Sequence, residues 1–485
     1  MAIGSGVTNS GEGVFSPTNY LLEEVKILRQ NLGSEEIGQK AIEIKKLVPE
    51  ITIKESIYRN AINVDIRVVD NVKLLNFLRL NGTEKVILKI SRKQNDDLNK
   101  FNLNLNIANI DMFTQINPST QSYVLRCVPE YVVLNQGQTI SQKFSDMSKD
   151  ISAICGSIGI KEDAQDIPVT GISSKGIIPF MKPLSAIGWL VRNSHESGTP
   201  FYFYQTSNGI VHLKSYINMI EDVHEDGTRY NDQNIFNYYQ ENPGEKDSAD
   251  DFFTLEKFQI RKLNSKLNLS GLRNISNGAY ASNKFSVDIF EKNYKSDESF
   301  SYDVIDKKLN EHKPFPEDLK IKDVPLNKYS TGKNYYINLN GGAFSKAEDI
   351  SEKTDNQNYH GVINDQIQQK EAYHHLLDTH QQELVLAGDF NMQVGKSIFI
   401  KIAGNASADP LTKKDELNNE GDLMASGKYI ITTLEHKFTN QEFTTRILCK
   451  KDSYAVDLNE PDQFFKKEEN TVNADGTITE DSNNG

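Results

Sequence analysis

The sequence predicts a mixed α+β protein in which two small antiparallel β-barrels flank an α/β domain. In two regions, residues 49–138 and 381–457, apolar side chains alternate with polar ones, which is typical of strands with one buried face. Between these regions apolar side chains recur at helical spacing, so the middle of the chain is expected to contain helices. A partly helical N-terminal extension and a disordered acidic C-terminal tail complete the prediction.

Length and composition indicate a soluble globular protein of several domains. A chain of 485 residues is too long for one hydrophobic core, and 37% hydrophobic and 25% charged residues are ordinary values for a folded protein. No run approaches the ~18 apolar residues that a membrane-spanning helix needs. The N-terminus lacks a basic end followed by an apolar core, so no secretory signal is expected.

The net charge argues against one class of function, and the cysteines indicate the compartment in which the protein folds. The net charge of −13 argues against a protein whose main task is to grip nucleic acid, because phosphate binding needs a basic face. It is compatible with a surface past which DNA slides without binding. Cys127, Cys155 and Cys449 show no Cys-x-x-Cys spacing and are expected to be buried free thiols in a reducing compartment.

The N-terminal extension, residues 1–48, is expected to be partly helical after a mobile Gly/Ser-rich start. Thr18 is a candidate cap for a helix that ends at Gly33. The apolar face of this helix would carry Leu21, Val25 and Leu28. A second short helix is expected over residues 37–47.

The first barrel is assigned to residues 49–138. Short segments of period-two alternation are separated there by polar turns, as in a small antiparallel barrel or sandwich. The expected strands are 51–53, 62–68, 86–90 and 123–134. A short helical turn closed by Gly82 is expected between the second and third of these strands.

The α/β domain is assigned to residues 139–254. Helical spacing of apolar residues predicts a first helix over 144–158. A second helix is expected within 181–194, where Pro183 occupies a favoured start position. A hairpin with Asn208-Gly209 in its turn follows.

The second barrel is assigned to residues 255–294 together with 381–457. Its last part, Ser426–Ser453, has the alternation of two paired strands. A polar insertion, residues 295–380, separates the two parts and ends in a helix.

The acidic tail, residues 458–485, cannot bury a core. From Asn459 onward it holds seven acidic residues and two lysines among many Asn and Thr, which is typical of disorder. Its segment around Asn473, Asp475 and Gly476 resembles half of a calcium loop. The first and last ligand positions would be Thr471 and Ser482, where Asp and Glu are needed, so no calcium site is predicted.

Three histidines near the end of the insertion are candidate metal ligands. His374 and His375 are adjacent, so on a helix their side chains point apart, and no His-Glu-x-x-His spacing is present. His380 fits the apolar face of the helix, and His374 is placed to pair with Asp378. We therefore predict no metal site.

Other candidate chemistry also fails on spacing. The segment Ser330–Tyr335 resembles part of a phosphate loop, but Asn327 stands where the first Gly is required. The segment 171–176 is not a nucleophile elbow, which needs Gly-x-Ser-x-Gly. Trp189 is expected to pack in a core or interface. The acidic residues are scattered, so no catalytic, cofactor-binding or metal residue and no cofactor are predicted.

Four segments resemble the central baseplate hub proteins of contractile-tailed, T-even-like bacteriophages. The first has an acid-Ser-Ile step at Glu55, Ser56 and Ile57, then Asp70 with Leu74-Leu75, then Gly82 and Glu84. The second and third are 123–154 and 182–213. The fourth, 385–453, includes Gly388-Asp389, Gly395 and Ser426-Gly427-Lys428-Tyr429. The resemblance spans residues 49–457 except for 295–365.

This resemblance implies a structural protein of the virion tail baseplate, assembled in the host cytoplasm, and no enzyme. Two tube-like barrels per chain in a homotrimer would form a ring with pseudo-six-fold symmetry, joining the hexameric tail tube to the trimeric central spike. Segments 62–68 and 398–402 would form the ring, and 182–192 with the next hairpin would lie outside, where the spike or baseplate wedge proteins bind. An acidic lumen would let DNA pass without binding.

Two alternatives stay open at this point. One is a tail-associated cell-wall hydrolase whose acid is hidden among the scattered carboxylates. The other is the hub or spike protein of a related contractile injection system, which normally adds a β-helical spike. The 27 residues after Leu458 contain no repeat of that kind.

Overall fold

The fold is known from a computed structural model of the chain. The described residues are 16, 18–28, 41–75, 80, 82, 84–92, 100–170, 173–221, 238–239, 259–267, 271–288, 293–305, 308–311, 320–338, 367–402, 424–440 and 442–454. The expected acidic tail, the Gly/Ser-rich start and much of the insertion lie outside these residues.

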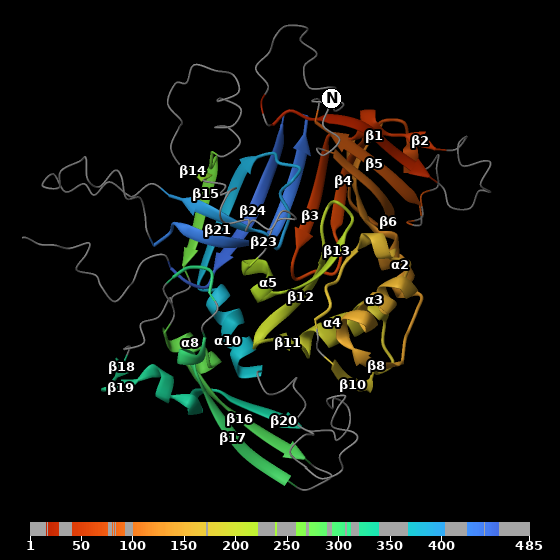
Figure 1. Cartoon of the computed structure of the whole chain (residues 1–485). Helices are drawn as coiled ribbons and strands as arrows, with labels where there is room; N and C mark the ends of the chain where they lie inside the picture. Colours follow the sequence, from red (N-terminus) through yellow and green to blue (C-terminus); the bar gives the residue numbers. More distant parts are fainter. Residues whose placement is uncertain are drawn as a thin grey trace, which may run out of the picture.

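Thirteen of the described strands form one large, mainly antiparallel sheet that joins the two ends of the chain (Figure 1). The N-terminal strand set comprises β1 (Leu21–Leu28), β2 (Ile42–Glu43), β3 (Glu50–Ser56), β4 (Asn63–Asp70), β5 (Lys85–Ser91), β6 (Lys100–Asn117) and β7 (Thr120–Pro129). The C-terminal strand set comprises β14 (Tyr238–Tyr239), β15 (Lys262–Leu267), β21 (His380–Ala387), β22 (Ser397–Lys401), β23 (Gly427–Thr439) and β24 (Phe443–Lys451). Strands β3 and β23 pair antiparallel and make the two sets continuous.

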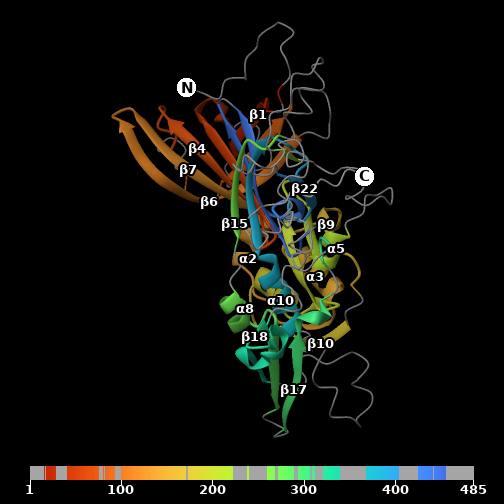
Figure 2. The same cartoon turned by 90° about the vertical axis from the view of Figure 1, so that its left-hand side faces the viewer.

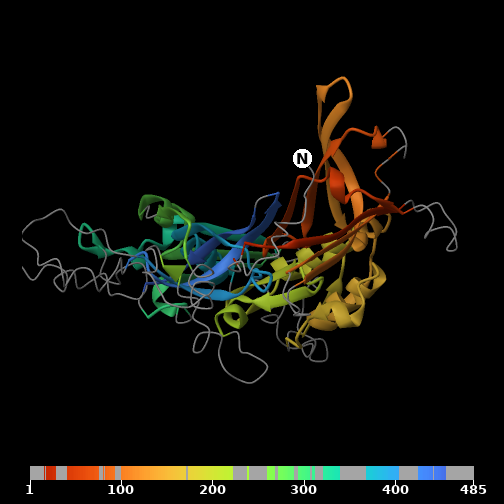
Figure 3. The same cartoon turned by 90° about the horizontal axis from the view of Figure 1, so that it is seen from above.

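The mixed α+β class is therefore confirmed, whereas closed barrels are not shown among the described strands. Each strand set packs on its own apolar core. The N-terminal core includes Val25, Ile53, Ile66, Leu88 and Leu125. The C-terminal core includes Leu384, Ile400, Tyr429 and Ile447. Seen from above, the sheet bends, and strands β6 and β7 stand up from the C-terminal set (Figure 3).

The helices predicted in the N-terminal extension are wrong where the chain is described. Leu21–Leu28 form strand β1, which pairs antiparallel with β5, and a register shift lies between Leu22 and Glu24. This irregularity puts Leu22 and Val25 on the buried side, three residues apart, so the strand imitates helical spacing. Residues 41–47 form β2 and a 3-10 turn, Lys45–Leu47, where a second helix was expected.

The strand predicted over 123–134 is correct only as far as Pro129. Pro129 lacks an N–H group, and helix α2 (Glu130–Gln136) begins directly after it. The preceding hairpin is longer than expected, because β6 runs for 18 residues. β5 pairs with β6 only over Lys100–Asn106. The rest of β6 therefore pairs only with β7, which in turn pairs with β4 as far as Gln121. This end of the β6–β7 hairpin, which we call the arm, projects at one corner of the sheet (Figure 2).

The middle of the chain contains the predicted helices and hairpin. Helix α3 (Met147–Ser157) is capped by Asp146, and helix α4 (Pro183–Arg192) begins at Pro183 as expected. Phe144 lies in strand β8 (Lys143–Asp146), ahead of the helix, and β8 pairs with β10 (Ser173–Ile177). The predicted hairpin is β12 (Thr199–Gln205) and β13 (Val211–Ser215). The remaining elements are β9 (Gln165–Asp166), β11 (His195–Glu196), α5 (Tyr216–Ile220) and the 3-10 turn Glu162–Ala164.

The segment 255–294 does not belong wholly to the second strand set, which corrects the prediction. Strand β15 pairs with β21, but β16 (Ala281–Asp288) pairs with β17 (Asn293–Ser301) and β20 (Asn334–Asn338) in a separate small sheet. This sheet lies at the far end of the molecule from β1 (Figure 1). Near it are α8 (Gly271–Asn277), β18 (Lys320–Ile321), β19 (Val324–Pro325) and three 3-10 turns at Tyr302–Val304, Leu326–Lys328 and Ser330–Gly332. The helix predicted at the end of the insertion is α10 (Ile367–Leu377).

Two bulk predictions can be compared with the structure. Cys127, Cys155 and Cys449 are buried free thiols, as expected. Within the described ranges, none of the helices is long and apolar enough to cross a membrane.

Candidate functional site

A polar surface lies on the side of the joined sheet that faces away from the two apolar cores. One charged side chain from each of seven neighbouring strands forms a row across it. From the C-terminal to the N-terminal set the row is Glu383 (β21), Arg446 (β24), Glu435 (β23), Lys54 (β3), Asp65 (β4), Arg126 (β7) and Asp111 (β6). We call this surface the charged face.

The row is continuous, because each member contacts or directly opposes the next. Arg446 forms an ion pair with Glu383, Lys54 Nζ lies 2.8 Å from Asp65 Oδ2, and Arg126 Nε lies 2.7 Å from Asp111 Oδ2. The remaining neighbours are register partners, which lie close together on one face of an antiparallel pair. These partners are Arg446 with Glu435, Glu435 with Lys54, and Asp65 with Arg126.

The polar side chains of the charged face are placed by the alternation of the strands. On β3, Ile51 and Ile53 point into the N-terminal core, so Thr52 and Lys54 point outward. A pocket of about 190 Å³ lies on this side, and its rim includes Met112. Met112 has a φ of 54° at a register shift in β6, which turns its side chain over the charged row.

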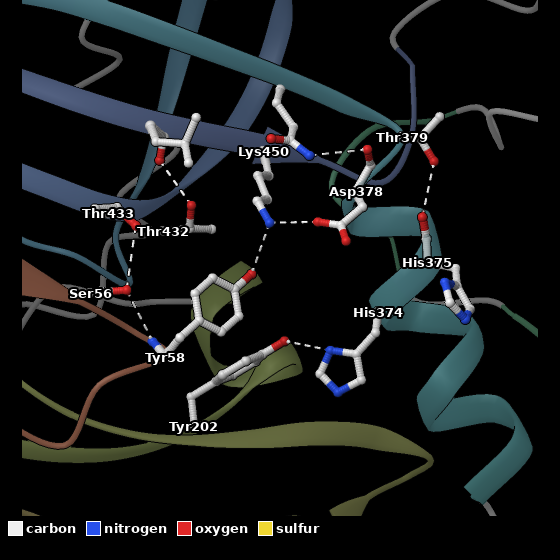
Figure 4. Close-up of polar contacts among 12 residues, drawn as sticks. Ser56, Tyr58, Tyr202, His374, His375, Asp378, Thr379, Thr432, Thr433 and Lys450 are labelled. Carbon is white, nitrogen blue, oxygen red and sulfur yellow. Dashed lines mark hydrogen bonds and ion pairs between the residues drawn. The ribbon is translucent and has the colours of Figure 1, made fainter. Parts of the chain in front are cut away.

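A second hollow lies where the two strand sets meet the α/β domain. It is a cleft of about 420 Å³ between the loop after β3, helix α4 and strand β12. Its lining is mostly aromatic and apolar and includes Ile57, Tyr58, Leu184, Phe201 and Tyr202. A cluster of polar contacts that includes Tyr58 and Tyr202 adjoins the cleft (Figure 4).

This cluster ties helix α10 to the sheet. Lys450 Nζ donates to Asp378 Oδ1 at 2.5 Å and to the Tyr58 hydroxyl at 3.3 Å, as Figure 4 shows. The Tyr202 hydroxyl lies 3.4 Å from Nδ1 of His374. The pairing of His374 with Asp378 that the sequence suggested is therefore wrong, because Lys450 is the partner of Asp378 and Tyr202 is the partner of His374.

The pKa shifts in this cluster keep each group in its ordinary form near neutral pH. Burial raises the pKa of Tyr58, so the phenol keeps its proton. Burial alone would lower the pKa of Lys450, but Tyr58 and Asp378 outweigh it and raise the pKa, so the ammonium group stays charged. Burial lowers the pKa of His374, so its imidazole stays neutral. A general acid or base works best with a pKa near the operating pH. The cluster therefore fits a structural tie better than proton transfer.

The three candidate histidines do not converge. His374 and His375 lie on α10, whereas His380 begins strand β21 and is buried. Burial, followed by the charge of Lys451, lowers the pKa of His380 to about 3. No group of three or more His, Cys, Asp or Glu side chains within the described ranges is arranged to hold a metal ion.

The remaining candidate sites form ordinary packing contacts or regular secondary structure where they are described. The Trp189 ring packs edge-on against Phe144 at 5.9 Å beside the core of the α/β domain, which confirms the packing prediction. Ser173–Ile177 is a strand, so the turn of a nucleophile elbow is not formed there. Ser330–Gly332 is a 3-10 turn, and Lys333 Nζ lies 5.4 Å from the centre of the Tyr335 ring. The calcium-like segment lies outside the described residues.

A residue whose role was missed from the sequence is Glu55, which is 1% exposed. Its carboxylate accepts hydrogen bonds from the backbone N–H of Ser207, at 2.7 Å, and of Val394, at 3.3 Å. It thus connects β3, the turn between β12 and β13, and the loop between β21 and β22. Burial raises its pKa to about 7, against the opposing effect of the Ser207 contacts. The signal was present in the sequence, because Glu55 follows the inward positions Ile51 and Ile53 in the same phase.

Comparisons with known proteins give matches in structure only. No family model matches the chain, and no curated protein matches it. The tail protein from Neisseria meningitidis MC58 has a TM-score of 0.46 and 9% identity over 89% of this chain and 97% of its own. The 43 kDa tail protein of prophage MuSo2 from Shewanella oneidensis has a TM-score of 0.44 and 8% identity over 89% and 98%.

A third match belongs to a secretion machine. The E. coli c3393 protein, described as a component of the type VI secretion system with structural similarity to the T4 bacteriophage tail proteins gp27 and gp5, has a TM-score of 0.36 and 8% identity. It covers 83% of this chain and 73% of its own. These matches concern the course of the backbone alone.

Proposed function

We propose that this chain is the structural hub of a contractile-tail baseplate. In this role three copies form a ring with pseudo-six-fold symmetry, which adapts a hexameric tail tube to a trimeric central spike and lets DNA pass during ejection. The same ring would serve a related contractile injection system. The sequence resemblance over residues 49–457 motivates the proposal, and its mechanism rests on shape and interfaces without a chemical step.

The observation that carries the proposal is the joined sheet. The chain contributes two strand sets, each with its own core, that meet at β3 and β23. The two sets share one face, which is directed away from both cores. Three copies would bring six such sets together, which is the number a six-fold tube presents. A single chain with two strand sets can therefore match both a three-fold and a six-fold neighbour.

The charged face is the part of the sheet that we assign to the lumen. Its row holds three cations and four carboxylates, so it is close to neutral, in contrast to the acidic lumen that the resemblance implied. Neighbouring strands lie ~4.8 Å apart, within the ~8 Å Debye length at physiological salt, so a passing phosphate senses the sum of both signs. Such a face gives DNA neither a basic track to bind nor a barrier to cross.

The other parts of the molecule fit contacts outside the ring. Seen from above, the α/β domain lies on the opposite side of the molecule from the raised tip of β6 and β7 (Figure 3). The small sheet of β16, β17 and β20 lies at the far end from β1 (Figure 1). We assign both parts to the surface of the ring that faces away from the lumen, where the central spike and the baseplate wedge proteins would bind. The polar cluster around Lys450 and Asp378 would hold α10 and the sheet in one rigid unit.

The first test of the function is the mass of the purified chain. We expect a trimer at micromolar concentration by analytical ultracentrifugation, and a ring with six lobes around a channel in negative-stain averages of the same sample. A monomer with a cleft would overturn the hub proposal. Activity on cell-wall substrate in a zymogram would instead support the hydrolase.

The charge balance of the charged face makes a separate prediction about DNA. We expect the native chain to give no salt-dependent binding of a 20-base-pair duplex by fluorescence anisotropy. The double variant Asp65→Lys with Glu435→Lys leaves five cations against two carboxylates in the row, so it should bind at 50 mM salt and lose most of its affinity by 200 mM.

A matched control separates the face from net charge. Glu130→Lys with Glu162→Lys makes the same change in total charge at exposed positions away from the charged face. This control should bind the duplex no better than the native chain. Equal binding by both double variants, or tight binding by the native chain, would contradict the assignment of the charged face to the lumen.

A further inference from the structure

Both ends of the charged face are strand edges without a backbone partner among the described residues. At one end, β15 pairs with β21 and with no other described strand. At the other end, the arm portion of β6 pairs with β7 alone, since β5 stops pairing at Asn106. An open edge presents free N–H and C=O groups and acts as a template for another strand.

The two edges carry opposite charges. Lys262 and Lys266 lie on the outer side of β15, on the same side as Glu383, because the register places Asn264 opposite Glu383. Both lysines are exposed and have no carboxylate partner in the described part of the chain. The row ends at the β6 edge with the carboxylate of Asp111. The alternation of charge therefore runs from a cationic edge to an anionic edge.

The arm also exposes apolar surface that nothing described covers. Met112 is 63% exposed, Phe113 55% and Ile116 58%, although they lie close together near the end of one hairpin. On the β15 edge, Leu267 is 49% exposed. Apolar side chains grouped on a projecting arm are typical of a contact surface.

We propose that the arm of one copy docks along strand β15 of the next copy. Backbone hydrogen bonds would join the two edges, the lysines of β15 would lie beside Asp111, and the charged face would continue without a break from copy to copy. Because the two edges differ, the contact is heterologous, and such contacts form closed rings when the rotation allows. This inference rests on the proposed ring and specifies which surfaces close it.

Cysteine cross-linking tests this contact directly, since the natural cysteines are all buried. Thr114→Cys on the arm and Lys266→Cys on β15 are prepared as separate single variants, both at exposed positions. A short bismaleimide should link the two variants when they are mixed, and should give little linked product with either variant alone. Linking of a single variant to itself would indicate a contact between identical surfaces and would overturn the proposal.

The result also separates this inference from the proposed function. A trimeric mass without cross-linking in the mixture would overturn the arm contact and leave the hub function standing. A monomeric mass would overturn both. As a second test, Asp111→Lys and the pair Lys262→Asp with Lys266→Asp should each weaken assembly at least tenfold. Combining all three changes in one chain should restore assembly, whereas no restoration would contradict the charge pairing.

Folding of these variants can be checked independently. The substituted positions lie outside the two apolar cores, so the far-ultraviolet circular dichroism spectrum and the melting temperature should stay close to those of the native chain. These positions are Asp111, Thr114, Lys262 and Lys266. Lys161→Asp supplies a matched control, because Lys161 is exposed in the α/β domain and lies on none of the strands that form the two edges. This control should assemble like the native chain.

Discussion

Replacing Glu55 with Gln is expected to remove a pH-dependent loss of stability of about 2–3 kcal/mol between pH 5 and pH 8. The pKa of Glu55 rises from an ordinary value of 4.5 to about 7 in the fold, so the folded chain binds a proton that the unfolded chain has released. Its contribution is therefore greatest at low pH and is lost as pH rises through 7. One pKa unit corresponds to ~1.4 kcal/mol, which sets the size of the effect.

Other buried groups oppose this trend, so the comparison must be made between variants. Burial lowers the pKa of His380 to about 3 and of His436 to about 4. Both imidazoles therefore reduce the stability of the fold when the pH falls below the pKa of histidine in the unfolded chain. Both histidines are present in the native chain and in Glu55→Gln, and they cancel in the difference. The quantity to plot is the difference in unfolding free energy between the two proteins against pH.

Chemical denaturation at several pH values measures this difference. The Gln side chain can accept the N–H of Ser207 through its oxygen but presents an amide group to Val394, which adds a constant cost at every pH. Glu130→Gln on exposed α2 is the control for the loss of a carboxylate, and its difference is plotted beside that of Glu55→Gln. A flat difference for Glu55→Gln would show that the Glu55 carboxyl titrates with the same pKa in both states.

The sequence predicted local structure well where a pattern repeats within one element. Helix α4 begins at Pro183 because proline suits the first turn, and the hairpin of β12 and β13 turns at Asn208-Gly209. Strand β1 was missed for a local reason, since a register shift between Leu22 and Glu24 hid its period of two. Pro129 marked the end of β7, but the apolar residues after it concealed the start of α2.

The joining of the two strand sets could not be predicted in this way. Glu435 lies opposite Lys54 although 381 positions separate them in the chain, and no local pattern specifies such a pair. The same limit hid the charged face, which exists only after seven strands are placed side by side. The sequence indicated one half of the Glu55 contact. Glu55 is placed to point into the core like Ile51 and Ile53, and a buried carboxylate requires hydrogen-bond donors. The donors themselves, Ser207 and Val394, lie in loops that are distant in the sequence.

Two of these long-range contacts connect the strand sets to the other parts of the molecule. The ring that we propose needs its strand sets and the α/β domain to move as one unit. Glu55 holds β3 to two loops, and Lys450 holds Asp378, which directly follows α10, to the sheet. Both joints lie where the N-terminal set, the C-terminal set and the α/β domain meet, so loss of either is expected to loosen all three.

Gly395→Ala is expected to destabilise the chain by about 3 kcal/mol or more. Gly395 has a φ of +80°, which costs an alanine roughly 1 kcal/mol or more. An added Cβ would also collide with the hydroxyl of Tyr204, and overpacking of this kind costs ~1–3 kcal/mol. The collision forces apart the loop that carries Val394 and the strand β12 that carries Tyr204.

A double-mutant cycle separates the two costs. Tyr204→Phe removes the hydroxyl and leaves the ring, so Gly395→Ala should cost ~1–2 kcal/mol less in that background. Gly209→Ala supplies the matched control, because Gly209 has a φ of +88° but no atom within 4 Å of an added Cβ, so it measures the backbone cost alone. Denaturant unfolding of the four proteins of the cycle gives the coupling energy. A coupling near zero would mean that the loop yields without pressing on Tyr204, and the rigid joint proposed between the C-terminal set and the α/β domain would then have to be abandoned.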